Sequence, residues 1–257
     1  MSPTASTGPV RTVRHPDGVV ELRLDDPGRG NALDLTTAEA LRDAASEVAA
    51  DPGGAVLLRT TGGSFCVGGD LRAFAGRGTE TGAYVHAVAS AAHTAIQVLY
   101  ELPVPLVTAV RGAAAGGGIG LALVGDIVLA ARSARFRLAY TAIGLTPDCG
   151  ASWFLPRLVG PRRAADLVLT GDDAEQWGLV SRSVADADLD DTAHRTAAEL
   201  AAGAGGALRA AKGLLRRGTG DELRRHLAEE ARSIAALADG RDAQDRMTSF
   251  LAAKSVS

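Results

Sequence analysis

Two glycine-rich segments of this 257-residue chain have the composition of backbone binding sites. GGSFCVGGDL spans residues 62–71, and GAAAGGGIGLALVGD spans residues 112–126, each behind an apolar stretch. A helix that begins at about Gly117 would point free backbone N–H groups outward, with the positive end of its dipole beside them. Such a turn suits an oxyanion if a second donor faces it, and the first segment is the candidate for that donor.

The second segment does not match the common phosphate-binding glycine motifs. A dinucleotide fingerprint G-x-G-x-x-G that starts at Gly116 meets Leu121 where its last glycine should stand. A P-loop that starts at Gly112 needs a lysine after Gly117, and Gly118 stands there. The alternative to an oxyanion site is a tightly packed strand-to-helix turn, for which glycine is the default residue.

The elements that would position these turns alternate between strands and helices. Residues 10–14 and 19–25 predict a hairpin through HPDG, and residues 55–61, 105–110 and 126–131 predict further strands. Helices are predicted over residues 36–51, with Thr36 or Thr37 as N-cap, and from Thr81 to Glu101. After about Pro156 the chain is mostly helical. This order predicts βαβ units with largely parallel strands and a C-terminal helical layer.

The composition is that of an ordinary globular protein, with 46% hydrophobic and 22% charged residues. A net charge of −3 gives no reason to expect a nucleic acid as partner. The apolar stretches are too short for a membrane span or a signal peptide, so we expect a cytoplasmic protein without a membrane partner. Cys66 and Cys149 offer neither a disulfide framework nor a metal-ligand spacing, so we expect no metal.

Three segments carry a more specific pattern together than each does alone. They are FCVGGDL at residues 65–71, AVRGAAAGGGIGLALVGDIVLAA at 109–131 and GLTPDCGASWFLPRLVG at 144–160. Together they resemble the crotonase, or enoyl-CoA hydratase/isomerase, superfamily over nearly the whole chain. The resemblance implies an α/β fold, with a crotonase-type spiral of β-β-α units in residues 1–195. It also implies a C-terminal helical region in residues 196–257 that makes trimer and CoA contacts, in a homotrimer or a dimer of trimers.

The resemblance implies that the substrate is an acyl-CoA thioester and that the oxyanion donors are the N–H groups of Gly69 and Gly117. Removing a proton from the α-carbon of a thioester requires stabilisation of the enolate oxygen, and one such donor is typically worth about 10²–10³ in rate. No permanently bound cofactor is implied, because coenzyme A enters as part of the substrate.

The acid/base group distinguishes the reactions of this family. The two hydratase glutamates are absent, because Gly120 and Tyr140 occupy their positions. Asp148 matches the catalytic aspartate of the isomerase branch, which implies an acyl-CoA isomerase that moves a proton or a double bond. Desolvation by three apolar neighbours, Leu145, Trp153 and Phe154, is expected to raise the pKa of Asp148. The alternative is that Asp148 merely caps a helix that starts near Ala151.

Two further residues leave the reaction open. His93 matches the active-site histidine of 4-chlorobenzoyl-CoA dehalogenase, so His93 and Asp148 could also support covalent dehalogenation. Otherwise His93 is a packed or surface residue of its helix. Tyr140 is expected to line the acyl pocket, to donate a hydrogen bond or to be plain core. The sequence is also compatible with a hydratase-like enzyme and with a catalytically silent acyl-CoA-binding paralogue.

The resemblance also assigns residues to the CoA moiety. Arg29 matches a basic position near the CoA phosphates, and Phe250 and Lys254 match the tail helix that reaches CoA. The same site is expected to include four residues near the first glycine turn, Ala32, Gly68, Asp70 and Leu71. Arg29 and Lys254 could equally be solvated surface residues, as is expected for the pair Arg216–Arg217. Relatives carry several more residues between Gly171 and Trp177, which leaves the shape of the acyl pocket open.

Overall fold

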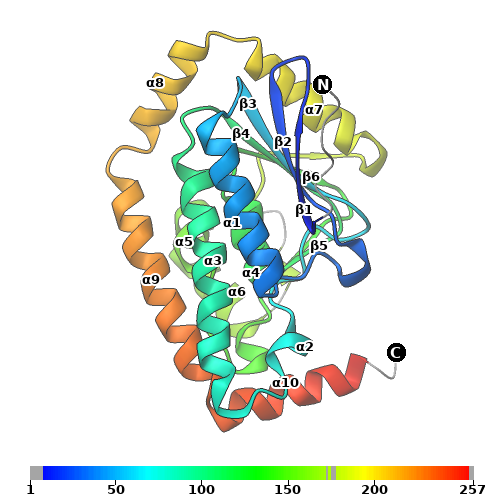
Figure 1. Ribbon diagram of the computed structural model, residues 1–257, viewed down its shortest axis with the longest axis vertical. Coiled ribbons are helices and arrows are strands. Elements are labelled where there is room, and N and C mark those ends of the chain that lie inside the picture. Colours follow the sequence, from blue (N-terminus) through cyan, green and yellow to red (C-terminus); the bar gives the residue numbers. More distant parts are fainter. Residues whose placement is uncertain (1–7, 172, 175–177, 255–257) are drawn as a thin grey trace.

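A six-stranded sheet forms the centre of the computed structural model, which describes residues 8–171, 173–174 and 178–254 (Figure 1). The strand order is β1-β2-β3-β4-β6-β9. The predicted hairpin is present as the antiparallel pair β1 and β2, and the other neighbours in this sheet are parallel. The strands are β1 (Val10–Arg14), β2 (Val19–Leu24), β3 (Ala55–Thr60), β4 (Leu106–Val110), β6 (Ile127–Ala131) and β9 (Arg182–Val184).

A second, smaller sheet supplies the second strand of each β-β-α unit. It contains β5 (Ala113–Ala115), β7 (Arg135–Arg137) and β8 (Asp173–Ala174). The chain passes from β4 in the large sheet to β5 in the small sheet and then into helix α4 (Gly117–Leu123). It repeats the step from β6 to β7 before helix α5 (Ala151–Val159). These are the predicted β-β-α units, and each unit brings a turn to the small sheet.

Long helices flank the large sheet and pack on one another. Helix α3 (Thr81–Glu101) has its predicted bounds and lies between α1 (Leu35–Ala50) and α9 (Thr219–Ala238) (Figure 1). The N-cap of α1 is Asp34, whose carboxylate accepts from the Thr37 N–H at 2.8 Å. The prediction of Thr36 or Thr37 as cap was therefore wrong, because the residue before the apolar period already supplies a capping oxygen.

The C-terminal region is helical, as predicted, from α7 (Leu189–Ala201) onward. It continues with α8 (Gly205–Leu215), α9 and α10 (Arg241–Lys254). Helix α7 packs on β3 and β4 and runs across the predicted boundary at residues 195 and 196. A division there would cut a helix in two, and the division into two parts stays a prediction.

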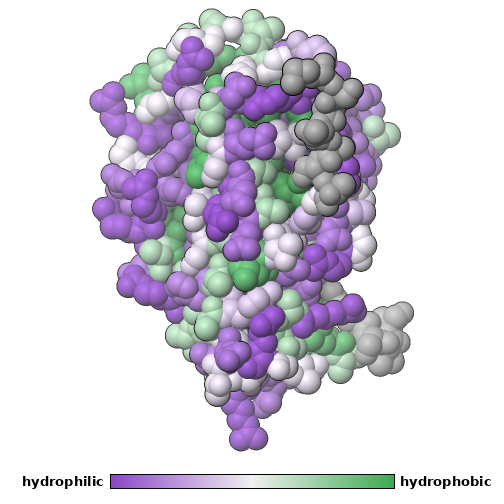
Figure 2. Space-filling view, viewed as in Figure 1, coloured by the Kyte–Doolittle hydropathy of each residue, from purple (hydrophilic) through white to green (hydrophobic). Residues whose placement is uncertain are grey.

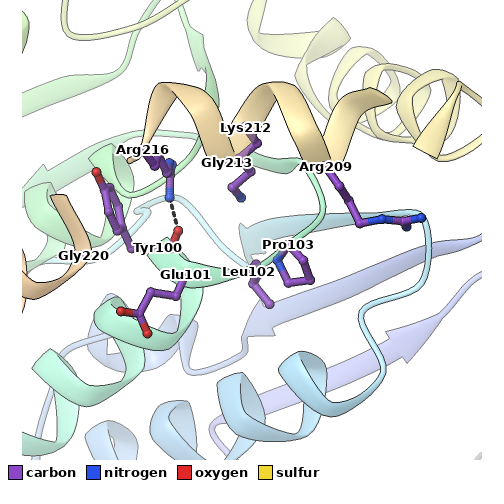
Figure 3. A pocket seen from close by; sticks show the side chains of 9 residues that line it. All are labelled: Tyr100, Glu101, Leu102, Pro103, Arg209, Lys212, Gly213, Arg216 and Gly220. Atoms are coloured by element: carbon purple, nitrogen blue, oxygen red, sulfur yellow. Dashed lines mark hydrogen bonds between the residues drawn. The ribbon is translucent and has the colours of Figure 1, made fainter. Parts of the chain in front are cut away.

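Buried Lys212 on α8 and partly buried Arg216 just after it hold α8 near the end of α3 (Figure 3). Lys212 and Arg216 both pair with Asp126, at 2.7 Å each. The Arg216 guanidinium also lies over the Tyr100 ring, 3.9 Å from its centroid, and donates to the Tyr100 carbonyl. The prediction that Arg216 is solvated was wrong, because Asp126 offers it a carboxylate, whereas Arg217 is exposed as predicted.

The outer surface in the same view is mostly hydrophilic, with smaller hydrophobic areas between the polar side chains (Figure 2). Among the described residues, no helix combines the length and the apolar character that crossing a bilayer requires.

Candidate active site

The two glycine-rich turns lie in contact with each other. Cys66 forms an isolated parallel bridge with Ala114, which aligns the first turn with strand β5. Gly68 follows with φ +84°, and a Cβ on it would lie 2.7 Å from the carbonyl oxygen of Ala115 and 3.2 Å from the nitrogen of Gly117. Only glycine allows this approach, so the small residues bring two backbone turns together.

Each turn leaves an amide without a partner. Helix α4 begins at Gly117 as predicted, so the Gly117 N–H has no acceptor within its helix. Within the described part of the chain, neither the Gly69 N–H nor the Gly117 N–H donates to a protein acceptor. The ring of Phe74 covers Gly69 so closely that a Cβ would lie 2.7 Å from it. Two neighbouring amides are thus left for an outside acceptor, which is the chemistry expected of an oxyanion site.

Asp148 lies beside the second of these turns. The Tyr140 hydroxyl donates to Asp148 Oδ1 at 2.7 Å, and this Oδ1 would lie 3.2 Å from a Cβ placed on Gly117. The backbone turns sharply after Asp148, with φ +56° at Cys149 and +77° at Gly150. A positive φ is costly for a cysteine, so packing must hold this turn in place.

The environment of Asp148 suits proton transfer. Burial raises its pKa to about 7, although the hydrogen bond from Tyr140 acts in the opposite direction. Leu145, Trp153 and Phe154 are all buried, and their contact with Asp148 stays a prediction. A carboxyl group with this pKa can both accept and return a proton near neutral pH. The capping alternative is wrong, because Gly150 is the N-cap of α5 and no side chain caps it from that position.

His93 faces the backbone of the same turn. It is only 5% exposed, and its Nε2 accepts from the Cys149 N–H at 2.8 Å. Burial lowers the pKa of His93, which agrees with an uncharged ring that accepts at Nε2. His93 is therefore buried in the site, and its visible contact supports the turn that carries Asp148.

Ligand atoms of His93, Asp148 and Cys149 lie within 4.8 Å of one another, and we tested them as a metal site. The Nε2 lone pair of His93 is already occupied by the Cys149 N–H. Burial also raises the pKa of the Cys149 thiol well above its ordinary value, and a metal needs the thiolate. These three side chains therefore do not fit a metal site. The raised pKa of the Cys149 thiol also argues against a mechanism in which this thiol is the nucleophile.

Gly120 shows why a glutamate is absent from α4. A Cβ on Gly120 would lie 1.7 Å from the carbonyl oxygen of Cys149. The turn that carries Asp148 therefore fills the space that a side chain at Gly120 would need. The absence of a side chain at position 120 therefore allows the turn that carries Asp148 to pack against α4.

Glu230, which was not predicted from the sequence, lies on α9 and is only 5% exposed. Its carboxylate accepts from the Gly150 N–H at 2.7 Å, from the Ser152 N–H at 3.1 Å and from the Ser152 hydroxyl at 2.5 Å. A signal was present in the helical period, because Glu230 falls on the face that buries Leu227 and Ile234. A charged residue on a buried face needs partners, and the N-terminus of α5 supplies them.

The residues assigned to CoA near the first turn do come together. The segment after Arg29 pairs with the glycine turn, since the Leu33 N–H donates to the Gly68 carbonyl at 2.8 Å and the Asp70 N–H donates to the Leu33 carbonyl at 3.0 Å. This pairing gathers Arg29, Ala32, Gly68, Asp70 and Leu71 around Gly69. Asp70 also caps helix α2 (Leu71–Phe74) by accepting from the N–H groups of Arg72 and Ala73.

Arg29 is not a free cation in this arrangement. Its guanidinium pairs with Asp34 at 2.6 Å, Asp26 at 2.7 Å and Asp70 at 3.1 Å. The hydrogen bond to Asp34 is the main reason that the pKa of Arg29 is raised further. A CoA phosphate would have to compete with these carboxylates, and the assignment stays a prediction.

The tail helix α10 packs on its own chain. It contacts α2 and the 3-10 turn Thr141–Ile143, and Phe250 on it is 37% exposed. Lys254 is its last residue. Contacts of Phe250 and Lys254 with CoA stay predictions. The segment between Gly171 and Trp177, where relatives are expected to carry more residues, lies largely outside the described residues.

The spiral of β-β-α units, with its two glycine turns in contact, defines the class of crotonase-type α/β proteins. The chain belongs to the enoyl-CoA hydratase/isomerase family, whose model matches residues 14–256.

Relatives with different reactions resemble the chain to a similar degree. It is 36% identical over 241 residues to a probable enoyl-CoA hydratase of Rhodobacter capsulatus, which covers 91% of this chain and 92% of the relative. It is 39% identical over 194 residues to 1,2-epoxyphenylacetyl-CoA isomerase of Escherichia coli, covering 72% and 73%. It is 35% identical over 201 residues to 4-chlorobenzoyl coenzyme A dehalogenase-1 of an Arthrobacter species, covering 74% and 72%.

A solved structure confirms the fold. The enoyl-CoA hydratase of Bacillus halodurans superimposes with a TM-score of 0.85 at 23% identity, over 94% of this chain and all of that one. The predicted crotonase-type α/β fold with a C-terminal helical region is therefore correct.

Proposed function

We propose that the protein is an acyl-CoA isomerase that moves a proton, and with it a double bond, on an enoyl-CoA thioester. The observation that carries this proposal is the position of Asp148. Its carboxylate lies beside the Gly117 turn, is held by the Tyr140 hydroxyl and has a pKa of about 7. Family membership supports the broader statement that the protein transforms an acyl-CoA.

In the proposed reaction the thioester oxygen accepts hydrogen bonds from the Gly69 and Gly117 N–H groups. Asp148 removes a proton from one carbon of the enoyl group, and the negative charge of the dienolate moves to the thioester oxygen. Asp148 then returns the proton to another carbon on the same face. One carboxyl group suffices, because the proton that it accepts is the proton that it donates.

Hydration would need a second acid/base group to activate water. A side chain at position 120 has no room, since its Cβ would overlap the Cys149 carbonyl. The Tyr140 hydroxyl already donates to Asp148, and burial raises its pKa well above the ordinary value. The site therefore favours isomerisation over hydration.

We also propose that the chain assembles as a homotrimer or a dimer of trimers and works in the cytoplasm. Several large apolar side chains are exposed on its helices, which supports an interface between copies. They are Leu158, Leu169, Leu214, Leu215 and Leu237. Two buried cysteines without a disulfide suit a reducing compartment.

The test is a spectrophotometric assay of the purified protein with a 3-enoyl-CoA and, separately, a 2-enoyl-CoA. We expect conversion of the 3-enoyl thioester to the conjugated form, no hydration of the 2-enoyl thioester, and no turnover by Asp148→Asn. Hydration without isomerisation would refute the proposal. Binding of both thioesters without any reaction would instead identify a catalytically silent paralogue.

Dehalogenation of an aromatic acyl-CoA is the second candidate. It is favoured by the closeness of His93 to the Asp148 carboxylate and by the 35% identity to a dehalogenase. His93→Gln separates the two candidates, because Gln can accept from the Cys149 N–H but cannot serve as a base. We expect His93→Gln to keep isomerase activity within about tenfold. Release of halide from a 4-halobenzoyl-CoA, abolished by His93→Gln, would favour the dehalogenase.

A further inference from the structure

The turn that carries Asp148 is held by two side chains from distant helices. His93 on α3 accepts from the Cys149 N–H, and Glu230 on α9 accepts from the Gly150 N–H at 2.7 Å. Consecutive amides of one turn are thus bound by separate helices. Because Cys149 has a strained positive φ, these two contacts help to fix the backbone conformation that places Asp148.

Glu230 is buried, and its carboxylate accepts hydrogen bonds from several donors. The N-terminus of α5 donates two backbone N–H groups and the Ser152 hydroxyl to its carboxylate. Charge-assisted bonds of this kind at a helix N-terminus stabilise an anion. The isomerase reaction proposed above does not use this anion.

The titratable groups around Glu230 come from three elements. His93 of α3 has its Nε2 3.9 Å from the carboxylate, and His226 of α9 has its Nε2 3.6 Å away. The third element is the turn itself, with Asp148 and Cys149. Burial lowers the pKa of His93, so this buried imidazole stays uncharged at neutral pH and does not cancel the negative charge of Glu230.

We propose that Glu230 is a positioning residue for Asp148: it holds the turn that carries the catalytic carboxylate and places a second negative charge near it. A nearby like charge disfavours ionisation, and the Glu230 charge acts together with burial to raise the pKa of Asp148. The expected effect of Glu230 on kcat rests on the proposed function, whereas its expected effect on the pKa of Asp148 does not.

The test compares Glu230→Gln with Glu229→Gln, a matched control on the same helix. Glu229 is exposed and pairs only with Arg232 among the described residues. Carboxyl carbon NMR of the unliganded protein, with the Asp148 signal assigned through Asp148→Asn, measures the pKa of Asp148. We expect Glu230→Gln to lower this pKa by at least about 0.5 unit and the control to leave it unchanged.

In the isomerase assay we expect Glu230→Gln to lower kcat by at least about tenfold with little change in KM, because the turn is displaced rather than the binding surface. The lower limb of the pH profile of kcat should move to lower pH along with the NMR titration. Glu230→Asp keeps the charge and should retain a higher Asp148 pKa than Glu230→Gln.

A folded Glu230→Gln protein with an unchanged Asp148 titration would overturn the inference. If Glu230→Gln does not fold, an Asp148 pKa in Glu230→Asp equal to the ordinary aspartate value would overturn it instead. A shifted titration in a protein that never isomerises an enoyl-CoA would leave the inference standing and refute only the proposed function.

Discussion

Replacing Asp148 by Asn should remove activity and at the same time stabilise the fold above neutral pH. The Asn side chain keeps the size of Asp and an oxygen that can accept from Tyr140, but it carries no charge. Burial raises the pKa of Asp148 from 3.8 to about 7 in the folded protein. At 1.36 kcal/mol for each pKa unit, ionising Asp148 in the folded state costs up to about 4 kcal/mol.

The sign of the pH dependence follows from proton linkage. Between pH 3.8 and about 7 the folded protein keeps a proton on Asp148 that the unfolded chain has released. The contribution of Asp148 to stability is therefore complete below pH 3.8, falls by about 1.4 kcal/mol for each pH unit and is lost above about pH 7. Asp148→Asn does not lose stability in this way. The excess of its free energy of unfolding over that of the wild type should therefore grow up to about pH 7 and then stay constant.

The assay is urea unfolding of both proteins at pH about 5, 6, 7 and 8, at one chain concentration. We expect the free energy of unfolding of the variant to exceed that of the wild type by about 2 kcal/mol more at pH 8 than at pH 5, as an order of magnitude. Asp166→Asn, at an exposed position of α6 (Pro161–Thr170), is the control and should show no such trend. A difference for Asp148→Asn that is the same at every pH would show that the protonation of Asp148 is not linked to folding.

The remaining predictions concern the neighbours of Asp148. Tyr140→Phe removes the hydroxyl that donates to the carboxylate, so the pKa of Asp148 should rise, and the acid limb of kcat/KM should move up by about 1 pH unit. An unmoved pH profile would contradict this. Gly120→Ala would place a Cβ 1.7 Å from the Cys149 carbonyl and should destabilise the fold by about 1–3 kcal/mol, measured by urea unfolding. Gly213→Ala on α8 has open space at its Cβ and should be neutral or stabilising, and equal effects of the two alanines would count against the packing argument.

Much of the fold could be predicted because it depends on local patterns. Helix α3 has its predicted bounds, and the hairpin β1–β2 lies where alternation and the turn HPDG predicted it. The cap of α1 was missed by two or three positions, since several capping residues stand in a row and the backbone conformation decides among them. Arg216 was misjudged because its partner, Asp126, is 90 residues away in the sequence and adjacent only in the fold.

The candidate site, like the fold, was predicted from the sequence only in part. The resemblance pointed to Gly69, Gly117 and Asp148, and the structure brings their segments together. It could not reveal that Tyr140 donates to Asp148, because both core packing and hydrogen bonding were compatible with a tyrosine there. Glu230 was missed although the helical period places it on the buried face of α9, because two of its three donors are backbone N–H groups, which residue type does not reveal.

In the proposed reaction, Asp148 removes a proton next to a thioester whose oxygen is held by two backbone amides. The most direct test is proton NMR of an enoyl-CoA thioester in deuterated water with the wild type and Asp148→Asn. We expect exchange of the α- or γ-protons for deuterium with the wild type and a rate at least about 10²-fold lower with the variant. Equal exchange with both proteins, or no exchange with a wild type that binds the thioester, would contradict it.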